Sequence, residues 1–286
     1  MILEKPIPFW KLSGSGNDFI LIDHRKMLIP EDKIAHFISK VCRRALSVGA
    51  DGVILIEASK EADYKWHYYN ADGGEAEMCA NGSRCAARFA VENKIAPRQH
   101  SFETLAGIVR AELLPEKGEK DPQTGRVRVH LPDPFDLQLN VKMTVNKQEK
   151  IGHIINTGVP HVIYFVEDVD RVDLISLGRE TRYHTLFSPN GTNVNFVSLC
   201  GPHRLKIRTY ERGVENETLA CGTGSIAAAL ITTALKKASP PFSIITQSGI
   251  VLGVDFTSEQ NAFKNISLEG DARIIYKGKI ETEALF

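Results

Sequence analysis

Hydrophobic and polar positions alternate between two patterns along the first half of the chain. Short runs rich in isoleucine, leucine, valine and aromatic residues predict strands at 19–23, 53–57 and 66–69. Between the first two runs, apolar residues recur at helical spacing, at Ile34, Phe37, Ile38 and Val41. This spacing predicts an amphipathic helix over residues 31–44.

A turn and a second helix are predicted after the third strand. Residues 70–74, Asn-Ala-Asp-Gly-Gly, are typical of a turn, and residues 79–92 are rich in alanine and arginine, which favour helices. From Ser101 the pattern indicates hairpins, with Gly107 in a turn. The polar stretch 115–125 is interpreted as an exposed loop between strands.

A break in the strand pattern predicts the junction between two domains. Residues 126–131 alternate basic and apolar side chains, and Pro132-Asp133-Pro134 ends this strand because proline cannot donate to a sheet. We place the junction between this break and about residue 140. The domains are therefore expected at 1–135 and 136–274.

The second half of the chain repeats the scheme of the first. Strands are predicted within 151–166, at 193–199 and at 205–210, and a helix is predicted near 172–181. A further helix opens at Cys221, as the earlier one opens at Cys79. The local match of Cys79-Ala-Asn-Gly-Ser with Cys221-Gly-Thr-Gly-Ser supports two pseudo-symmetric α/β domains of the α+β type.

Length and charge narrow the class of protein. A chain of 286 residues exceeds the usual domain size of roughly 100–150 residues, which favours two domains with a ligand cleft between them. The 35 basic and 35 acidic residues balance, so no global field would attract nucleic acid or an anionic membrane. The apolar stretches are shorter than the about 20 residues of a spanning helix, and we expect a cytoplasmic protein.

Five cysteines are too few and too scattered for a disulfide scaffold in a chain of this length. Cys79 and Cys85 are too far apart for a CxxC pair, and no paired histidines stand near either residue. We therefore expect no structural zinc and no other bound metal.

Cys79 and Cys221 share a setting, a glycine-containing turn followed by an alanine-rich helix. A helix N-terminus exposes unpaired N–H groups and about half a positive charge, which can hold a carboxylate and favour the thiolate of a nearby cysteine. Inversion of a carbon centre by proton transfer needs a base on one face and an acid on the other. The pair therefore predicts a two-base amino-acid epimerase that works without a cofactor.

A plainer interpretation of these cysteines has to be weighed. A lone cysteine is more often a small buried hydrophobic residue than a reactive group. The same setting occurs once in each half of the chain, and this repetition favours function. The remaining cysteines lack the setting, so we expect them to be packing residues: Cys42, Cys85 and Cys200.

Further polar segments could contact a ligand, although each also has a structural interpretation. Asn17 stands in a glycine-rich turn before a strand and His161 follows a proline turn, so either could satisfy only local hydrogen bonds. Asn193 and Asn195 share one face of a strand, where cross-strand hydrogen bonding is common. The Glu211-Arg212 segment is either a surface pair or a clamp for a zwitterion.

Together these segments resemble the diaminopimelate epimerase family. Its members carry, in this order, a GxGNDF segment, an NADG turn, a CxNG cysteine, a GxPH turn, an ERG segment and a CG[ST]G cysteine. The corresponding residues here are 14–19, 70–73, 79–82, 158–161, 211–213 and 221–224. The match runs through nearly the whole chain, and the complete set is highly specific.

The resemblance implies a fold and a reaction. Each of two domains would pack a mainly antiparallel sheet around a central helix, with the active site in the cleft between the domains and a C-terminal strand, at about 275–286, joining the first domain. The reaction would interconvert LL- and meso-diaminopimelate, on the route to lysine and peptidoglycan, without metal or cofactor. The expected partner is this small-molecule substrate, and a homodimer is a further expectation.

By motif position the resemblance also assigns roles to residues. Cys79 and Cys221 would be the acid/base pair. His161 would support the proton chemistry, and Glu211 would meet the distal ammonium. The reacting carboxylate would bind the backbone N–H groups of Ala80, Asn81, Gly222 and Thr223. The remaining contacts would be Asn17 at the reacting end and Asn70, Asn193 and Arg212 at the distal carboxylate.

Three positions depart from the family pattern. Ala80 replaces a glycine, Val159 an asparagine and Gly52 a glutamine found in some relatives. Loss of polar side chains at the last two positions allows relaxed specificity toward a shorter amino acid such as glutamate. The alternatives are a broad-specificity or proline-type racemase that uses the same cysteines, and a thiol redox or binding protein in which the cysteines form a disulfide.

Overall fold

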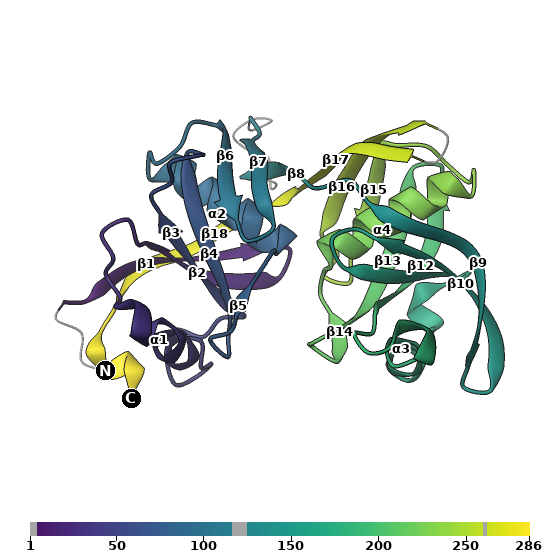
Figure 1. Cartoon of the computed structure of the whole chain (residues 1–286), viewed down its shortest axis with the longest axis horizontal. Coiled ribbons are helices and arrows are strands. Elements are labelled where there is room, and N and C mark those ends of the chain that lie inside the picture. Colours follow the sequence, from purple (N-terminus) through teal and green to yellow (C-terminus); the bar gives the residue numbers. More distant parts are fainter. Residues whose placement is uncertain (1–4, 116–124, 260–261) are drawn as a thin grey trace. The chain divides into compact units, whose positions relative to one another are not determined.

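The computed structural model describes residues 5–115, 125–259 and 262–286. The chain divides into two compact units, one formed by Met1–Val129 with Gly270–Phe286 and the other by His130–Glu269 (Figure 1). Both units have the α+β composition expected from the sequence. The loop predicted at 115–125 lies almost wholly outside the described residues.

Most of the first unit is a twisted sheet around one long helix. Its strands are β1 (Ile7–Gly14), β2 (Asn17–Asp23), β3 (Gly52–Glu57), β4 (Tyr64–Asn70), β5 (Glu75–Ala76), β6 (Gln99–Thr104), β7 (Gly107–Leu113), β8 (Arg126–His130) and β18 (Arg273–Ile280). Two pairs of strands, β2 with β3 and β4 with β6, are parallel. The pairs β1–β18, β1–β2, β3–β4, β4–β5 and β6–β7 are antiparallel.

The second unit is built in the same way. Its strands are β9 (Phe135–Val145), β10 (Gln148–Asn156), β11 (Pro160–Phe165), β12 (Asn193–Gly201), β13 (Arg204–Glu211), β14 (Asn216–Thr218), β15 (Phe242–Ile245), β16 (Val251–Glu259) and β17 (Ala262–Asp271). The pairs β11–β12 and β13–β15 are parallel. The pairs β9–β10, β10–β11, β12–β13, β13–β14, β15–β16 and β16–β17 are antiparallel.

The internal repeat is therefore stronger in the structure than in the sequence. Strands β1-β2-β3-β4-β6-β7 and β10-β11-β12-β13-β15-β16 pair in one order, antiparallel and parallel by turns. A helix follows the second strand of each series, α1 (Ile34–Val41) and α3 (Leu174–Arg182). A longer helix follows the short strand β5 or β14, namely α2 (Ala80–Glu92) and α4 (Gly222–Ala234).

Burial explains why these segments form helices. In α1 the buried residues are Ile34, Phe37, Ile38 and Val41, the positions that the helical spacing predicts, and a short 3-10 turn (Glu31–Lys33) precedes it. The longer helices α2 and α4 are buried on most sides and contact several strands of their own units. Their alanine, glycine and serine residues allow this burial, because small residues let strands approach the helix closely.

Two features differ from the sequence prediction. The segment expected to be a domain junction contains the first half of β9, an 11-residue strand whose pairing with β10 ties it to the second unit. The first unit accordingly ends at Val129 and resumes at Gly270, where the sequence predicted breaks at 135 and 275. Among the described residues, no helix is long and apolar enough to cross a membrane.

Candidate active site

The two cysteines singled out by their sequence setting are the N-caps of the two central helices. Cys79 precedes α2 and Cys221 precedes α4, both with an extended backbone. The Cys79 Sγ accepts a hydrogen bond from the Gly82 N–H at 3.4 Å, and the Cys221 Sγ accepts one from the Gly224 N–H at 3.4 Å. Each sulfur therefore lies at the positive end of a helix, among its first N–H groups.

Glycine at the third helical position is needed more in α4 than in α2. A Cβ built on Gly224 would lie 2.4 Å from Asn195 Oδ1, so a larger residue could not coexist with that amide. The nearest atom to a Cβ on Gly82 is Ile54 Cδ1 at 3.2 Å, the end of a flexible side chain. The Cys221 end is therefore packed tightly against a polar side chain, while the Cys79 end meets apolar groups.

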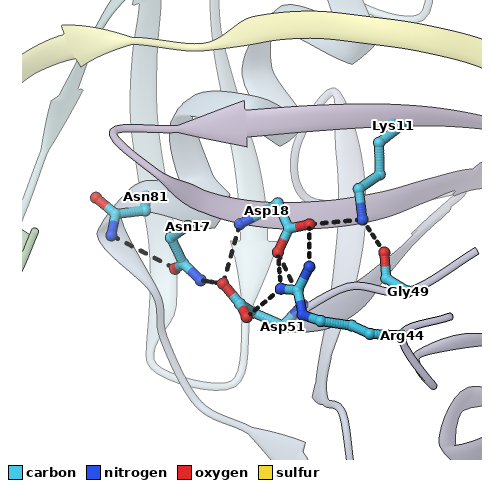
Figure 2. A network of polar contacts seen from close by, with 7 residues as sticks. All are labelled: Lys11, Asn17, Asp18, Arg44, Gly49, Asp51 and Asn81. Carbon is cyan, nitrogen blue, oxygen red and sulfur yellow. Dashed lines mark hydrogen bonds and ion pairs between the residues drawn. The ribbon is translucent and has the colours of Figure 1, made fainter. Parts of the chain in front are cut away.

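Asn17, at the start of β2, lies beside Cys79. The Cys79 thiol donates to Asn17 Oδ1 with an S···O distance of 3.6 Å, and Asn81 Nδ2 donates to the same oxygen at 3.4 Å. Asn17 Nδ2 donates to Asp51 Oδ2 at 2.7 Å (Figure 2). Because a carboxylate only accepts hydrogen bonds, Asp51 fixes which end of the Asn17 amide faces Cys79.

Behind Asn17 lies a network of charges, shown in Figure 2. The Arg44 guanidinium donates to both Asp18 and Asp51, and the buried Lys11 ammonium pairs with Asp18 at 2.7 Å. Burial alone would raise the pKa of Asp18, but hydrogen bonds from Arg44 and Lys11 outweigh it and lower that pKa to about 2. Asp18 therefore stays charged near neutral pH, and Arg44 bridges it to Asp51.

Arg84, on the second turn of α2, is fully buried and orients Asn81. Its guanidinium donates to Asn81 Oδ1 at 3.0 Å, to Ser15 Oγ at 2.8 Å and to the backbone oxygens of Ala80 and Asp271. Because Asn81 Oδ1 accepts from Arg84, the Asn81 NH2 group points to Asn17. Burial lowers the pKa of Arg84, and the nearby Asp271 charge partly offsets this effect.

A second chain of side chains ends at Cys221. Thr223 Oγ1 lies 3.5 Å from Cys221 Sγ, and His161 Nε2 lies 3.0 Å from Thr223 Oγ1. The other ring nitrogen of His161, Nδ1, is 3.1 Å from Asn195 Nδ2. His161 stands at the start of β11 and Asn195 in the neighbouring β12, so the sheet brings both to the N-terminal start of α4.

Asn195 determines which nitrogen of His161 carries the proton. Its Nδ2 donates to the Val162 oxygen at 3.0 Å, and its Oδ1 accepts from the Thr209 hydroxyl at 2.9 Å. The amide therefore presents an N–H to His161 Nδ1, which must accept, and the proton sits on Nε2. Burial, and secondarily the charge of Arg212, lower the pKa of His161 to about 3, so the ring is neutral near pH 7.

The residues assigned to the distal end of a substrate gather at two places. Asn193 Oδ1 accepts from the Arg212 backbone N–H at 2.9 Å, and Asn193 Nδ2 donates to the Pro160 oxygen at 3.2 Å, so this amide positions the Arg212 main chain. Glu211 Oε2 accepts from the Thr218 hydroxyl at 2.8 Å. Among the described residues, none forms an ion pair with the half-buried Arg212 guanidinium. The surface pair of Arg212 with Glu211, which the sequence allowed, is therefore not formed.

In the first unit, Asn70 is exposed at the end of β4, opposite Gly52 of β3. A Cβ on Gly52 would lie 2.7 Å from Tyr68 Cε2 and 2.4 Å from the Tyr69 oxygen, so the tyrosine ring occupies the place of a side chain there. The Tyr68 hydroxyl donates to Asn70 Oδ1 at 2.9 Å. Tyr68 thus supplies a polar group, its hydroxyl, where Gly52 has no side chain. Because this hydroxyl holds the Asn70 oxygen, the Asn70 NH2 group can donate to another acceptor.

The other three cysteines do not all behave as expected. Cys42 and Cys85 are buried packing residues, and burial raises the pKa of Cys42 to about 12 and that of Cys85 further. Cys200 is exposed, so its assignment as a packing residue is wrong. It lies near the end of β12, where the strand extends beyond the covered part of the sheet.

Within each unit, the structure therefore brings together most of the residues that the sequence suggested. Asn17, Cys79 and Asn81 meet in the first unit, and His161, Thr223 and Cys221 meet in the second. The sequence missed Asp51, Arg84, Tyr68 and the linking role of Asn195. Within the described ranges, no group of three His, Cys, Asp or Glu side chains is placed to hold a metal ion.

The chain is similar to proteins of one known family. The model of the diaminopimelate epimerase family matches residues 9–130 and 153–275. The diaminopimelate epimerase of Aquifex aeolicus (strain VF5) is 45% identical over 97% of this chain and 99% of its own length. That of Hydrogenobaculum sp. (strain Y04AAS1) is 43% identical over 96% of this chain and 98% of its own.

Solved structures of more distant proteins share the fold. A phenazine biosynthesis protein of the PhzF family from Bacillus anthracis has a TM-score of 0.74 at 14% identity, covering 96% of this chain and 99% of that one. A probable proline racemase from Agrobacterium radiobacter K84 has a TM-score of 0.69 at 16% identity, covering 96% and 92%. At such identities the likeness shows the fold alone.

Proposed function

The chain belongs to the diaminopimelate epimerase family, and on this premise we propose that it interconverts LL- and meso-diaminopimelate by proton transfer between two cysteines. One observation carries the proposal: each unit places a cysteine sulfur at the start of its central helix, 3.4 Å from the third N–H. Such a position favours both an ionisable thiol and a bound carboxylate.

The reaction needs one sulfur on each face of the α-carbon. A thiolate takes the α-proton while the thiol of the other cysteine delivers a proton to the opposite face, so the proton count on the protein is unchanged. In each helix the cysteine sulfur accepts a hydrogen bond from the third N–H group. We assign the first two N–H groups to the substrate carboxylate: Ala80 and Asn81 in α2, Gly222 and Thr223 in α4. These donors stabilise the charge that spreads onto the carboxylate as the α-proton leaves.

The assignment of the supporting residues follows their hydrogen bonds. Asn17 lies beside the thiol of Cys79 and would contact the reacting end of the substrate. His161 is neutral, so we assign it support of proton transfer through Thr223 rather than direct acid or base work. Glu211 remains assigned to the distal ammonium.

Recognition of the distal carboxylate separates diaminopimelate from shorter amino acids. Arg212 supplies a guanidinium, and Asn70 supplies an NH2 group oriented by Tyr68. Asn193 holds the Arg212 backbone and has one amide N–H beyond its bond to Pro160. Because these groups suit a distal carboxylate, we do not expect the preferred substrate to be proline, which lacks one, or glutamate, whose second carboxylate lies closer to the α-carbon.

Solvent deuterium exchange tests this function. Incubation of LL-diaminopimelate in deuterium oxide should place deuterium at one α-carbon and produce the meso isomer, both followed by NMR and chiral chromatography. Parallel incubations with proline and glutamate test the broad-specificity alternative. Turnover of proline without diaminopimelate would contradict the proposal, as would absence of α-carbon exchange with any amino acid, which is the result expected of a thiol redox protein.

A homodimer and a cytoplasmic location are further proposals that rest on the family alone. Light scattering on the purified chain gives the mass in solution, and cell fractionation gives the location. A monomer, or recovery from a membrane fraction, would remove the corresponding statement without affecting the proposed reaction.

A further inference from the structure

The two thiol-capped helices offer the same environment from the backbone side. Each sulfur accepts the third N–H of its helix at 3.4 Å, and each helix is 13 residues long, so the helix dipoles contribute equally to the two thiols. Any difference between Cys79 and Cys221 must therefore come from the side chains around them.

At Cys79 the neighbouring side-chain atom is an acceptor. Asn17 Nδ2 is held by the Asp51 carboxylate, and Asn17 Oδ1 receives an N–H from Asn81, whose own oxygen is held by Arg84. These hydrogen bonds fix the orientation of both amides, Asn17 and Asn81. The Asn17 carbonyl oxygen therefore faces the Cys79 sulfur at 3.6 Å. A carbonyl oxygen stabilises an S–H group and repels a thiolate.

At Cys221 the neighbouring side-chain atom is a donor. The Thr209 hydroxyl donates to Asn195, the Asn195 NH2 group to His161 Nδ1, and the His161 Nε2–H group to Thr223 Oγ1. Thr223 Oγ1 accepts this bond, and its own hydrogen can point to Cys221 Sγ, 3.5 Å away, in a contact where either atom can donate. A hydroxyl that donates to sulfur stabilises the thiolate.

Formal charges near the two sites do not reverse this difference. Behind Asn17, Lys11 and Arg44 face Asp18 and Asp51, which leaves no net charge. The buried Arg84 would favour a thiolate at Cys79, and Asp271 offsets it through Ser15, which bonds to both groups. Arg273 pairs with the same carboxylate, but its side chain is 55% exposed, so solvent screens its charge. In the second unit Arg212 acts on His161 and lowers the pKa of the ring, and a positive charge there favours a thiolate at Cys221.

We propose that the free enzyme holds Cys221 as the thiolate and Cys79 as the thiol, with Asp51 and Asn195 as the positioning residues that set this difference. The inference rests on the proposed function and deepens it. The Cys221 thiolate takes the α-proton and becomes a thiol, while Cys79 gives up its proton and becomes a thiolate. One direction of the reaction therefore starts from the populated form, and the other starts from the minor form.

The pH dependence of alkylation measures the two thiols separately. The substrate-free enzyme is treated with iodoacetamide over a range of pH, and peptide mass spectrometry gives a rate for each cysteine. We expect the midpoint of the Cys221 profile to lie about one pH unit or more below that of Cys79, a tenfold difference in thiolate population at neutral pH. Exposure alone predicts faster reaction at Cys79, because the side chain of Cys221 is only 8% exposed.

Two substitutions should move the profiles independently. Thr223→Val removes the donor and should raise the Cys221 midpoint toward that of Cys79, whereas Thr223→Ser should restore it. Asp51→Asn frees Asn17 to rotate and should lower the Cys79 midpoint while leaving that of Cys221 in place. Thr233→Val is the matched control on α4, because the Thr233 hydroxyl is buried without a hydrogen-bond partner among the described residues.

The inference is overturned if the Cys79 midpoint equals or lies below that of Cys221, or if Thr223→Val leaves the Cys221 profile unchanged. These measurements need no substrate and are therefore independent of the deuterium assay. Reversed midpoints with normal exchange would remove only the assignment of the thiolate. Midpoints in the expected order without exchange on diaminopimelate would remove the proposed function instead.

Discussion

The two units can be compared strand by strand, because they pair their strands in one order and begin the central helix at a cysteine in the same place. Asn17 begins the second strand of the first series and His161 stands at the start of the second strand of the other. Asn70 and Glu211 likewise end the corresponding fourth strands. Equivalent strand ends thus carry different polar groups.

The repeated fold supplies the common part of the site, and single side chains supply the asymmetry. The helix N-terminus is a backbone property and recurs with the fold. The acceptor at Cys79 and the donor at Cys221 come from side chains of neighbouring strands. An enzyme that inverts a centre needs this combination, since the two faces of a carbon require similar positions and opposite proton states.

Removal of either sulfur should have the largest effect. Cys79→Ser and Cys221→Ser are each expected to lower epimerisation by about a thousandfold or more, because a hydroxyl is far more difficult to ionise than a thiol. Deuterium incorporation into diaminopimelate measures the loss. Cys200→Ser, at an exposed cysteine, is the control and should retain activity. Full activity in either of the first two variants would remove that cysteine from the mechanism.

Alanine at the third position of each helix tests the difference in packing. Gly224→Ala should destabilise the protein by about 1–3 kcal/mol, because its Cβ would lie 2.4 Å from the Asn195 oxygen, which is fixed by several hydrogen bonds. Gly82→Ala should be tolerated better, since the facing Ile54 methyl can move. Urea denaturation compares the two variants, and equal destabilisation would contradict the asymmetry.

Tyr68→Phe tests the orientation of Asn70 in the first unit. Loss of one hydrogen bond to the Asn70 oxygen should raise the KM for diaminopimelate by about two- to tenfold while changing kcat less. Tyr64→Phe, in the same strand, is the matched control, because its buried hydroxyl has no partner among the described residues. A fall in kcat with unchanged KM would place Tyr68 in proton transfer rather than substrate recognition.

The pH dependence of stability tests the burial of His161. Burial lowers the pKa of His161 from 6.5 to about 3, so the unfolded chain binds a proton that the folded chain does not between these values. The stabilisation is complete above pH 6.5 and is lost as the pH falls toward 3. His161→Asn should therefore flatten the fall in unfolding free energy between pH 7 and 4, whereas the same change at exposed His36 should not.

The local elements and the family follow from short-range patterns in the sequence. Apolar spacing gave the buried face of α1, and the two cysteine segments gave the starts of α2 and α4, because periodicity and capping act over a few residues. The pattern missed the strand that begins at Phe135, since it follows a proline break and most of its side chains are exposed or half-buried.

The hydrogen bonds that connect the site residues depend on the folded chain, because they join positions far apart in the sequence. Asn17 meets Asp51 across 34 positions, and Ser15 meets Asp271 across 256, and no local pattern specifies such pairs. The same holds for the bonds by which Asn195 sets the tautomer of His161. These contacts depend on strand register, because a shift of one residue would turn every side chain of a strand to the opposite face of the sheet.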